Sequence, residues 1–217
     1  MRGVINSEGK EGLKMLEEKW ASPEDFATLF QYFWYRDFPM DAKKAIGARR
    51  PDWTIHIGVV VRNIGDLIGL ATRFERGGRK DAILRSTEGD EIALEWEWED
   101  IWGRNGKLKG NELRKLKNHK VWPKNKEGLK YAVLITYTQA SGEETKKVYD
   151  KVVEAWEGAP WPLLLILIEV EKSKNRMRRE FMTIRMSVFD KGKRTELRSA
   201  PACPWEVAGT RWSYELK

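Results

Sequence analysis

The chain has 217 residues, of which 41% are hydrophobic and 34% are charged, and Lys and Arg outnumber Asp and Glu by 40 to 33. A chain of this length buries a substantial core, either as one large domain or as one domain with a helical appendage. One cysteine and two histidines exclude a disulfide framework and a thiolate metal cluster, and leave little material for a histidine metal site or a Ser-His-Asp triad. We expect a cytoplasmic protein that does not enter a membrane, because no apolar signal segment opens the chain and its longest apolar run, residues 162–168, is too short to span one.

The excess positive charge lies in two segments. Residues 104–126 carry many basic side chains against the single acid Glu112, and residues 172–179 form a second basic cluster. Such patches are typical of proteins that bind DNA or RNA, although an ordinary solvated surface has the same composition. The residues that we expect to contact nucleic acid are Arg114, Lys115, Lys117, Lys120, Lys174, Arg176, Arg178 and Arg179.

The N-terminal part is expected to be helical. Ser22-Pro23 followed by two acidic residues is a strong helix start, aromatic residues then recur at helical spacing, and Pro39 ends the helix. A further helix is predicted from about residue 54 or 59 to Phe74, stopping at Gly77-Gly78.

Residues 81–99 predict a β-hairpin that gathers carboxylates on one face. In its second strand apolar and acidic residues alternate strictly, and Glu88-Gly89-Asp90 supplies the turn. A turn at this place pairs Asp81 with about Glu97 and brings Asp81 onto the face of the glutamates. Carboxylates so close together repel one another and need a cation, for which a hard divalent metal is the obvious candidate. The alternative is a solvated face that a residue such as Arg85 neutralises.

The second half of the chain alternates helices and strands. We predict a basic helix at residues 111–119, a strand at 131–138, a helix from Ser141 to Gly158, an apolar interior strand at 162–171 and another strand at 181–189. Residues 196–213 are too broken by proline to assign.

The order helix, three strands, helix, strand over residues 55–171 resembles the common core of the PD-(D/E)xK nucleases, which have the restriction-endonuclease-like fold. In that superfamily an Asp lies on the hairpin and an acid-x-Lys tripeptide on the next strand. Here Asp81 is followed by Glu95-Trp96-Glu97 at the usual separation. The resemblance implies an α/β protein with an α-β-β-β-α-β core, built on a central mixed sheet flanked by helices. We assign the core to residues 55–175, with an N-terminal helical addition at 1–54 and a C-terminal β extension at 176–217, all in one compact domain.

The resemblance also implies a chemistry. Asp81, Glu95 and the main-chain carbonyl of Trp96 would hold Mg²⁺ or Mn²⁺, which activates a water for in-line attack on a phosphodiester. The implied catalytic set is Asp81, Glu95 and Glu97, in which Glu97 orients or deprotonates the water or binds a second metal ion. Glu97 stands where the superfamily has lysine, as in some type II restriction enzymes that carry Glu-x-Glu. The alternative is that a lysine from another position takes the role of the superfamily's lysine; the candidates are Lys107, Lys109 and Lys117.

The sequence therefore predicts a metal-dependent nuclease, and most directly a DNA endonuclease of the restriction-enzyme type that acts on double-stranded DNA. Many relatives pair two subunits, so a homodimer is compatible with this function. Two alternatives stay open. One is a nucleic-acid-binding module of the same fold that has lost catalysis, for which the missing lysine is the best argument. The other is a protein-interaction domain whose glutamate face binds a basic partner.

Overall fold

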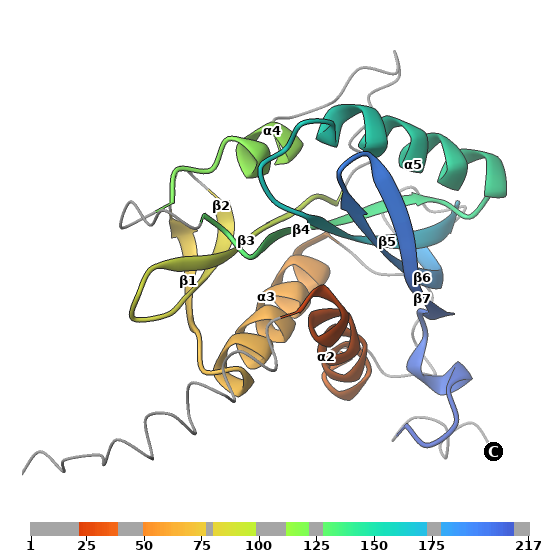
Figure 1. Ribbon diagram of the computed structural model, residues 1–217. Helices are drawn as coiled ribbons and strands as arrows, with labels where there is room; N and C mark the ends of the chain where they lie inside the picture. Colours follow the sequence, from red (N-terminus) through yellow and green to blue (C-terminus); the bar gives the residue numbers. More distant parts are fainter. Residues whose placement is uncertain are drawn as a thin grey trace, which may run out of the picture.

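A computed structural model describes residues 22–38, 50–76, 80–98, 112–121, 128–172 and 179–210. These residues form one seven-stranded sheet with helices on both faces (Figure 1). The elements in chain order are α2 (Pro23–Arg36), α3 (Arg50–Leu67), β1 (Ala71–Arg76), β2 (Lys80–Arg85), β3 (Asp90–Trp96), α4 (Glu112–Lys117), β4 (Tyr131–Gln139), α5 (Gly142–Trp156), β5 (Leu163–Lys172), β6 (Arg179–Asp190), β7 (Lys193–Pro201) and the short 3-10 helix η1 (Pro204–Glu206). The predicted mixed α/β class is confirmed. Among the described helices, none has the length and apolar character needed to cross a membrane.

The strands follow one another across the sheet in chain order. β1, β2 and β3 form an antiparallel meander, β3, β4 and β5 are parallel, and β6 and β7 continue antiparallel. Each parallel pair needs a crossover connection; α4 lies in the connection from β3 to β4, and α5 in that from β4 to β5. Because such crossovers are right-handed and the strand order continues in one direction, both helices lie on the same face of the sheet (Figure 1).

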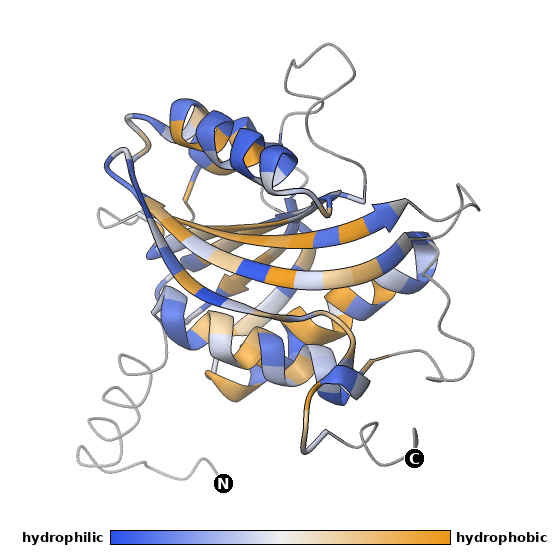
Figure 2. Cartoon of the chain, turned by 90° about the vertical axis from the view of Figure 1, so that its right-hand side faces the viewer, coloured by the Kyte–Doolittle hydropathy of each residue, from blue (hydrophilic) through white to orange (hydrophobic). Residues whose placement is uncertain are grey.

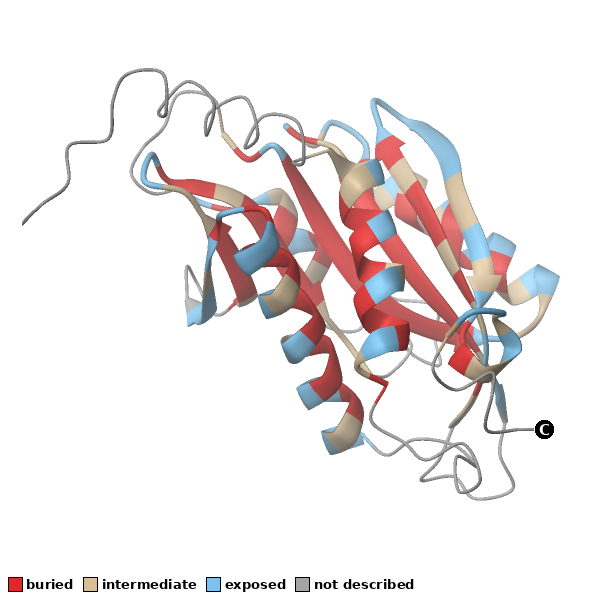
Figure 3. Ribbon diagram, turned by 90° about the horizontal axis from the view of Figure 1, so that it is seen from below, coloured by how far each residue is buried: buried red, intermediate tan, exposed pale blue. Residues whose placement is uncertain are grey.

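The core has two layers, one on each face of the sheet. One hydrophobic cluster packs α2 and α3 against the sheet, and a second packs α4 and α5 against the opposite face. β4 and β5 lie between the layers, and their apolar runs lack alternation because both faces are covered. The hydrophobic residues accordingly concentrate on the strands in Figure 2, and the buried residues on the central strands and on the inner sides of the helices in Figure 3.

The first predicted helix is confirmed. α2 begins after Ser22, whose hydroxyl oxygen accepts a hydrogen bond from the Asp25 main-chain N–H at 3.1 Å, and Pro23 occupies its first turn. Apart from the exposed Tyr32, its aromatic residues belong to the core, with Phe30 and Trp34 fully buried.

The second predicted helix is wrong at its C-terminal end. α3 stops at Leu67, Gly69 turns the chain with a φ of 76°, and the edge strand β1 follows where we predicted helix. A Cβ atom at Gly65 would lie 2.4 Å from Thr72 Oγ1, so glycine at this position lets β1 approach α3 closely. β1 is largely exposed and lacks the apolar alternation that marks a half-buried strand, which is why the sequence pattern does not reveal it.

The acidic hairpin is confirmed, but its register is displaced by two residues from the prediction. Ala82 pairs with Leu94, and the turn spans residues 86–89. Because side chains alternate between the faces of a strand, a displacement of two residues leaves each side chain on its predicted face. Asp81 and Glu95 therefore still share a face.

The later elements agree with the prediction apart from their ends. α4 is shorter than the predicted basic helix, β6 begins earlier than predicted, and β7 occupies part of the span to which we assigned nothing. β6 and β7 add to the same sheet as the predicted core, next to β5.

His56 provides a test of this packing by pH. The imidazole lies among the rings of Trp34, Phe38 and Trp53, and burial lowers its pKa to about 4. The unfolded chain binds a proton at this histidine below about pH 6.5, whereas the folded protein does not until about pH 4, so the free energy of unfolding should fall as the pH drops through that window. The loss is at most about 3 kcal/mol. Urea unfolding of the wild type and of His56→Leu at pH 7 and pH 4.5 checks this: the variant should lose clearly less stability, and equal losses would contradict the assignment.

Candidate active site on the acidic hairpin

Asp81 and Glu95 meet on neighbouring strands, on the face of the sheet that α4 covers. The register of β2 and β3 places them beside each other, and Asp81 Oδ2 accepts a hydrogen bond of 2.7 Å from the Trp96 main-chain N–H. Burial raises the pKa of Asp81, despite the hydrogen bonds that it receives from Trp96 and from the Glu95 carboxyl. The two carboxyl groups that we assigned to metal binding and catalysis are thus in direct contact.

Glu95 is a buried carboxyl group, with a relative exposure of 1%. α4 covers it, so it does not belong to the solvated glutamate face that we considered as an alternative. Its Oε1 atom is buried and accepts no hydrogen bond from a described residue. Burial, together with the charge of Asp81, raises the pKa of Glu95 to about 8. This carboxyl group therefore needs a cation or a proton.

Lys115 is a cation that the structure brings into contact with these acids. Its Nζ atom lies 3.2 Å from Glu95 Oε2 and 3.8 Å from Glu112 Oε1. Burial opposes the charge of this ammonium group, but the surrounding carboxylates raise its pKa overall, so it is protonated at neutral pH. The Glu112 carboxyl adds a third acidic group, and its Oε2 atom is buried without a partner in the described part of the chain.

The sequence pattern does not predict the contact of Lys115 with Glu95. We placed Lys115 among the residues that contact nucleic acid, and named Lys107, Lys109 and Lys117 as candidates for a displaced lysine. Lys117 instead donates to the main-chain oxygens of Ala155 and Glu157 at the end of α5, while Lys107 and Lys109 lie outside the described residues. The available signal was the crossover itself: a helix between parallel β3 and β4 must lie over those strands, and thus over Glu95.

Glu97 and Trp96 complete the motif. Trp96 turns its ring to the opposite face, where it meets Phe74 at 6.4 Å between ring centroids, as the strand alternation predicts. Glu97 follows directly after β3, is partly exposed, and donates its main-chain N–H to Ile135 O at 3.0 Å. Its charge is near enough to contribute to the raised pKa of Asp81.

Arg85 binds an acidic residue at the turn end of the hairpin. Its guanidinium binds Asp90, with Nε 2.7 Å and Nη2 2.6 Å from Asp90 Oδ1. The partner that we considered for a solvated glutamate face is therefore engaged at the other end of the hairpin.

The donors at the site fit a hard divalent cation. Carboxylate oxygens are the ligands that Mg²⁺ and Mn²⁺ prefer. Glu95 Oε1 and Glu112 Oε2, which accept no hydrogen bond from the described residues, are available for that role. The described residues contain no group of three or more His, Cys, Asp or Glu side chains already arranged around one metal position. A metal ion would thus be held by Asp81 and Glu95 with few protein ligands, as is usual for Mg²⁺.

The residues predicted to bind nucleic acid fall into three groups. Arg114 and Lys120 are exposed on and after α4. Lys115 and Lys117 make the internal contacts given above. Lys174, Arg176 and Arg178 lie outside the described residues, and Arg179 opens β6 with a side chain that is also outside them.

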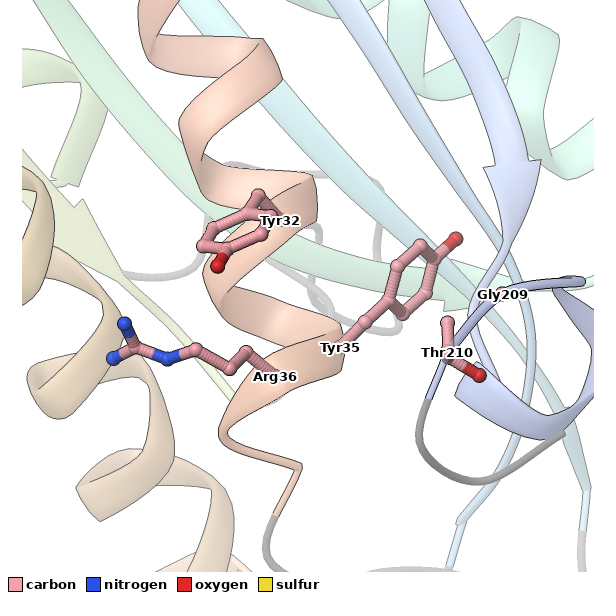
Figure 4. A pocket seen from close by; sticks show the side chains of 5 residues that line it. All are labelled: Tyr32, Tyr35, Arg36, Gly209 and Thr210. Carbon is pink, nitrogen blue, oxygen red and sulfur yellow. The ribbon is translucent and has the colours of Figure 1, made fainter. Parts of the chain in front are cut away.

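A pocket of about 250 Å³ lies elsewhere on the protein, on the α2 side of the sheet (Figure 4). Tyr32, Tyr35 and Arg36 line it from α2, and Gly209 and Thr210 line it from the end of the described chain. None of the predicted site residues belongs to it, so it is separate from the acidic site.

Comparisons with known proteins give weak likenesses. No protein-family model and no curated protein matches the sequence. Among solved structures, the YaeQ protein from Xanthomonas axonopodis pv. citri is 13% identical, with a TM-score of 0.28 over 67% of this chain and 79% of that one. A carbon-nitrogen hydrolase from Helicobacter pylori G27 is 12% identical, with a TM-score of 0.35 over 86% of this chain and 82% of that one. Both scores are too low to carry an argument about fold or function.

The buried Glu95 should cost stability at neutral and alkaline pH. In the unfolded chain a glutamate ionises near pH 4.5, whereas the folded protein retains this proton until about pH 8, so the wild type should lose stability as the pH rises through that window. Glu95→Gln removes the ionisation and should be more stable than the wild type at pH 8, by on the order of 1–2 kcal/mol. Denaturant unfolding at pH 5 and pH 8 measures the difference. Glu91→Gln, on the same strand, is the control. If the stability difference between E95Q and the wild type is no larger at pH 8 than at pH 5, the buried state of Glu95 is contradicted.

Proposed function

We propose that this chain is a metal-dependent nuclease of the restriction-endonuclease-like fold that hydrolyses phosphodiester bonds in double-stranded DNA. The observation that carries the proposal is the contact of three groups on one face of the sheet: the Asp81 and Glu95 carboxyls beside each other, and the Lys115 ammonium against Glu95. Two acids and a lysine are the residue types that the PD-(D/E)xK resemblance requires, and two of the three are at the positions that it implies.

The order of the elements supports the fold in this proposal. α3 precedes the antiparallel meander β1, β2 and β3, and α4 then leads to the parallel strand β4, which is an α-β-β-β-α-β series. These elements differ from those in our prediction, which omitted β1 and relied on the later helix and strand. Asp81 lies on the second strand of the meander and Glu95 on the third.

The side chains suit hydrolysis at phosphorus. A divalent cation held by Asp81, Glu95 and the Trp96 carbonyl would supply a water of lowered pKa and offset the charge of the phosphate. Lys115 is protonated, and its ammonium stabilises the negative charge that develops as the water oxygen bonds to phosphorus. Glu97, which is partly exposed directly after β3, orients the water or takes its proton. The bond from phosphorus to the leaving oxygen breaks on the opposite side, and the leaving oxygen keeps the electron pair and takes a proton from a water molecule.

The surface around the site suits a polyanion. Arg114 and Lys120 are exposed on and after the same helix that carries Lys115. Basic side chains beside an acidic centre let DNA approach carboxylates that would otherwise repel it.

Cleavage of supercoiled plasmid tests the proposal. The purified protein should nick or linearise the plasmid at low salt with Mg²⁺ or Mn²⁺ and not with EDTA. Asp81→Asn, Glu95→Gln and Lys115→Met should each lower the rate by about 100-fold or more, because each removes a group that acts in the transition state. Lys193→Met is the matched control: this exposed lysine lies on β7, at the far edge of the sheet, and its loss should leave the rate unchanged.

The outcomes separate the competing functions. Metal-dependent cleavage that the three substitutions abolish establishes the nuclease and its site. Salt-sensitive DNA binding without cleavage in any metal would favour the inactive binding module instead, for which Glu97 in the place of lysine is the supporting observation. If the protein neither cleaves nor binds DNA, a protein-interaction domain is the function that remains.

The salt dependence of DNA binding identifies the phosphate contacts. The double substitution of Arg114 and Lys120 by alanine should weaken binding similarly for all sequences and lower the slope of log K against log salt by about two, since each lost phosphate contact removes about one. Fluorescence anisotropy with a labelled duplex, measured from about 50 to 200 mM salt, gives the slope. An unchanged slope would place the DNA away from α4.

A further inference from the structure

A second group of charged side chains lies at the other end of the β2–β3 hairpin, next to the end of α4. Asp90 is buried, with its side chain 1% exposed, and binds the Arg85 guanidinium through Oδ1. Its Oδ2 atom is 3.0 Å from Nε2 of His119, whose side chain is 0% exposed. The proposed hydrolysis uses none of these residues.

The strand geometry explains how Asp90 reaches this face. Beyond Leu84 the pairing of β2 with β3 shifts at a β-bulge, so that Arg85 pairs with Asp90 directly. The bulge turns the Asp90 carboxylate toward α4, onto the face that holds Glu95 five positions further along β3. One strand therefore carries both the partner of His119 and the partner of Lys115.

The His119 ring is neutral and fixed in its orientation. Burial, together with the Lys80 ammonium, lowers its pKa, even though the hydrogen bond to Asp90 acts in the opposite direction. A neutral ring facing a carboxylate donates its Nε2–H, and its Nδ1 atom is buried without a partner among the described residues. The Trp161 ring packs against it, with 6.5 Å between ring centroids.

α4 depends on such contacts for its position. A helix of six residues is too short to be stable by itself, so its place is set by what it touches. Leu113 and Leu116 bury its underside, but apolar contacts are non-directional and permit sliding. The hydrogen bond from His119 to Asp90 is a directional contact between the end of this helix and β3.

We propose that Asp90 and His119 are positioning residues that fasten the end of α4 to β3 and thereby hold the Lys115 ammonium in contact with Glu95. Lys115 lies four residues before His119 and its partner lies on the strand that carries Asp90, so release of His119 lets the lysine leave the acid. The use of this arrangement in catalysis rests on the proposed function; the arrangement itself does not.

The first experiment measures the contact in the full-length protein without metal or DNA. NMR cross-relaxation between the Lys115 and Glu95 side chains should be present in the wild type, lost in His119→Ala, and restored in His119→Gln, whose amide N–H replaces the Nε2 donor. Val152→Ala is the control for lost stability, because it opens a cavity in the same core layer and changes a residue of α5, not of α4 or β3. If His119→Ala does not fold, Asp90→Leu gives the same test, because leucine has a similar volume and no atom that can accept the Nε2–H hydrogen bond. A His119→Ala or Asp90→Leu protein that keeps the Lys115–Glu95 contact overturns the proposal, as does a Val152→Ala protein that loses it.

The second experiment measures coupling in catalysis. Replacement of Lys115 by Met should lower the cleavage rate by about 100-fold in the wild type but by only a fewfold in His119→Ala, since the lysine is already displaced there. His119→Ala alone should lower kcat with KM unchanged, and His119→Gln should recover most of kcat. Equal effects of the Lys115 change in both backgrounds would contradict the positioning role. If no cleavage is found at all, the proposed function fails, while the NMR result still decides the positioning.

Discussion

A carboxyl group that leaves water must find a proton or a cation, and in this protein that requirement is concentrated at Glu95. The strand alternation turns this residue away from the α2 and α3 layer, and the crossover from β3 to β4 lays a helix over it. The helix brings Lys115 to one oxygen, while the other oxygen accepts no hydrogen bond from a described residue. The rest of the site follows from this half-satisfied carboxyl group, since Asp81, Glu112 and Lys115 are all arranged around it.

The buried Glu95 carboxyl lowers the stability of the folded protein at the place where the proposed function needs a charged group. A buried acid with a pKa near 8 weakens the folded state at neutral pH, and apolar packing at the same position would be the more stable solution. The sheet offsets this cost elsewhere, because β4 and β5 are covered on both faces by two separate hydrophobic layers. Burial of an unsatisfied oxygen at one point in an otherwise well-packed α/β protein is expected where a charged ligand is to be bound.

The sequence predicts the two acids but not the lysine, and the reason is physical. Alternation along a strand and a short turn are local, so the common face of Asp81 and Glu95 can be read even though the register was displaced by two residues. The contact of Lys115 with Glu95 joins residues on different elements through a crossover, and nothing in the local pattern distinguishes Lys115 from Lys117, which points to the end of α5. β1 was missed for a similar reason: its close approach to α3 depends on Gly65 in another element, and its exposed residues show no apolar period.

On the proposed function, glutamate in place of lysine at position 97 is explained if Lys115 of α4 supplies the positive charge. A lysine at that position would stand as a second cation beside the carboxylates and would compete with a divalent metal for them. With Lys115 in contact with Glu95 and the buried Lys80 ammonium near it, the three acids Asp81, Glu95 and Glu112 outnumber these two cations, and Glu97 adds to that excess. Such an excess of acids would, on the proposed function, hold protons in the absence of a metal ion and would exchange them for the ion on binding. On the proposed function, the replacement of lysine by glutamate is therefore coupled to the place of α4: the helix supplies the positive charge, and the strand is free to provide an acid that acts on water.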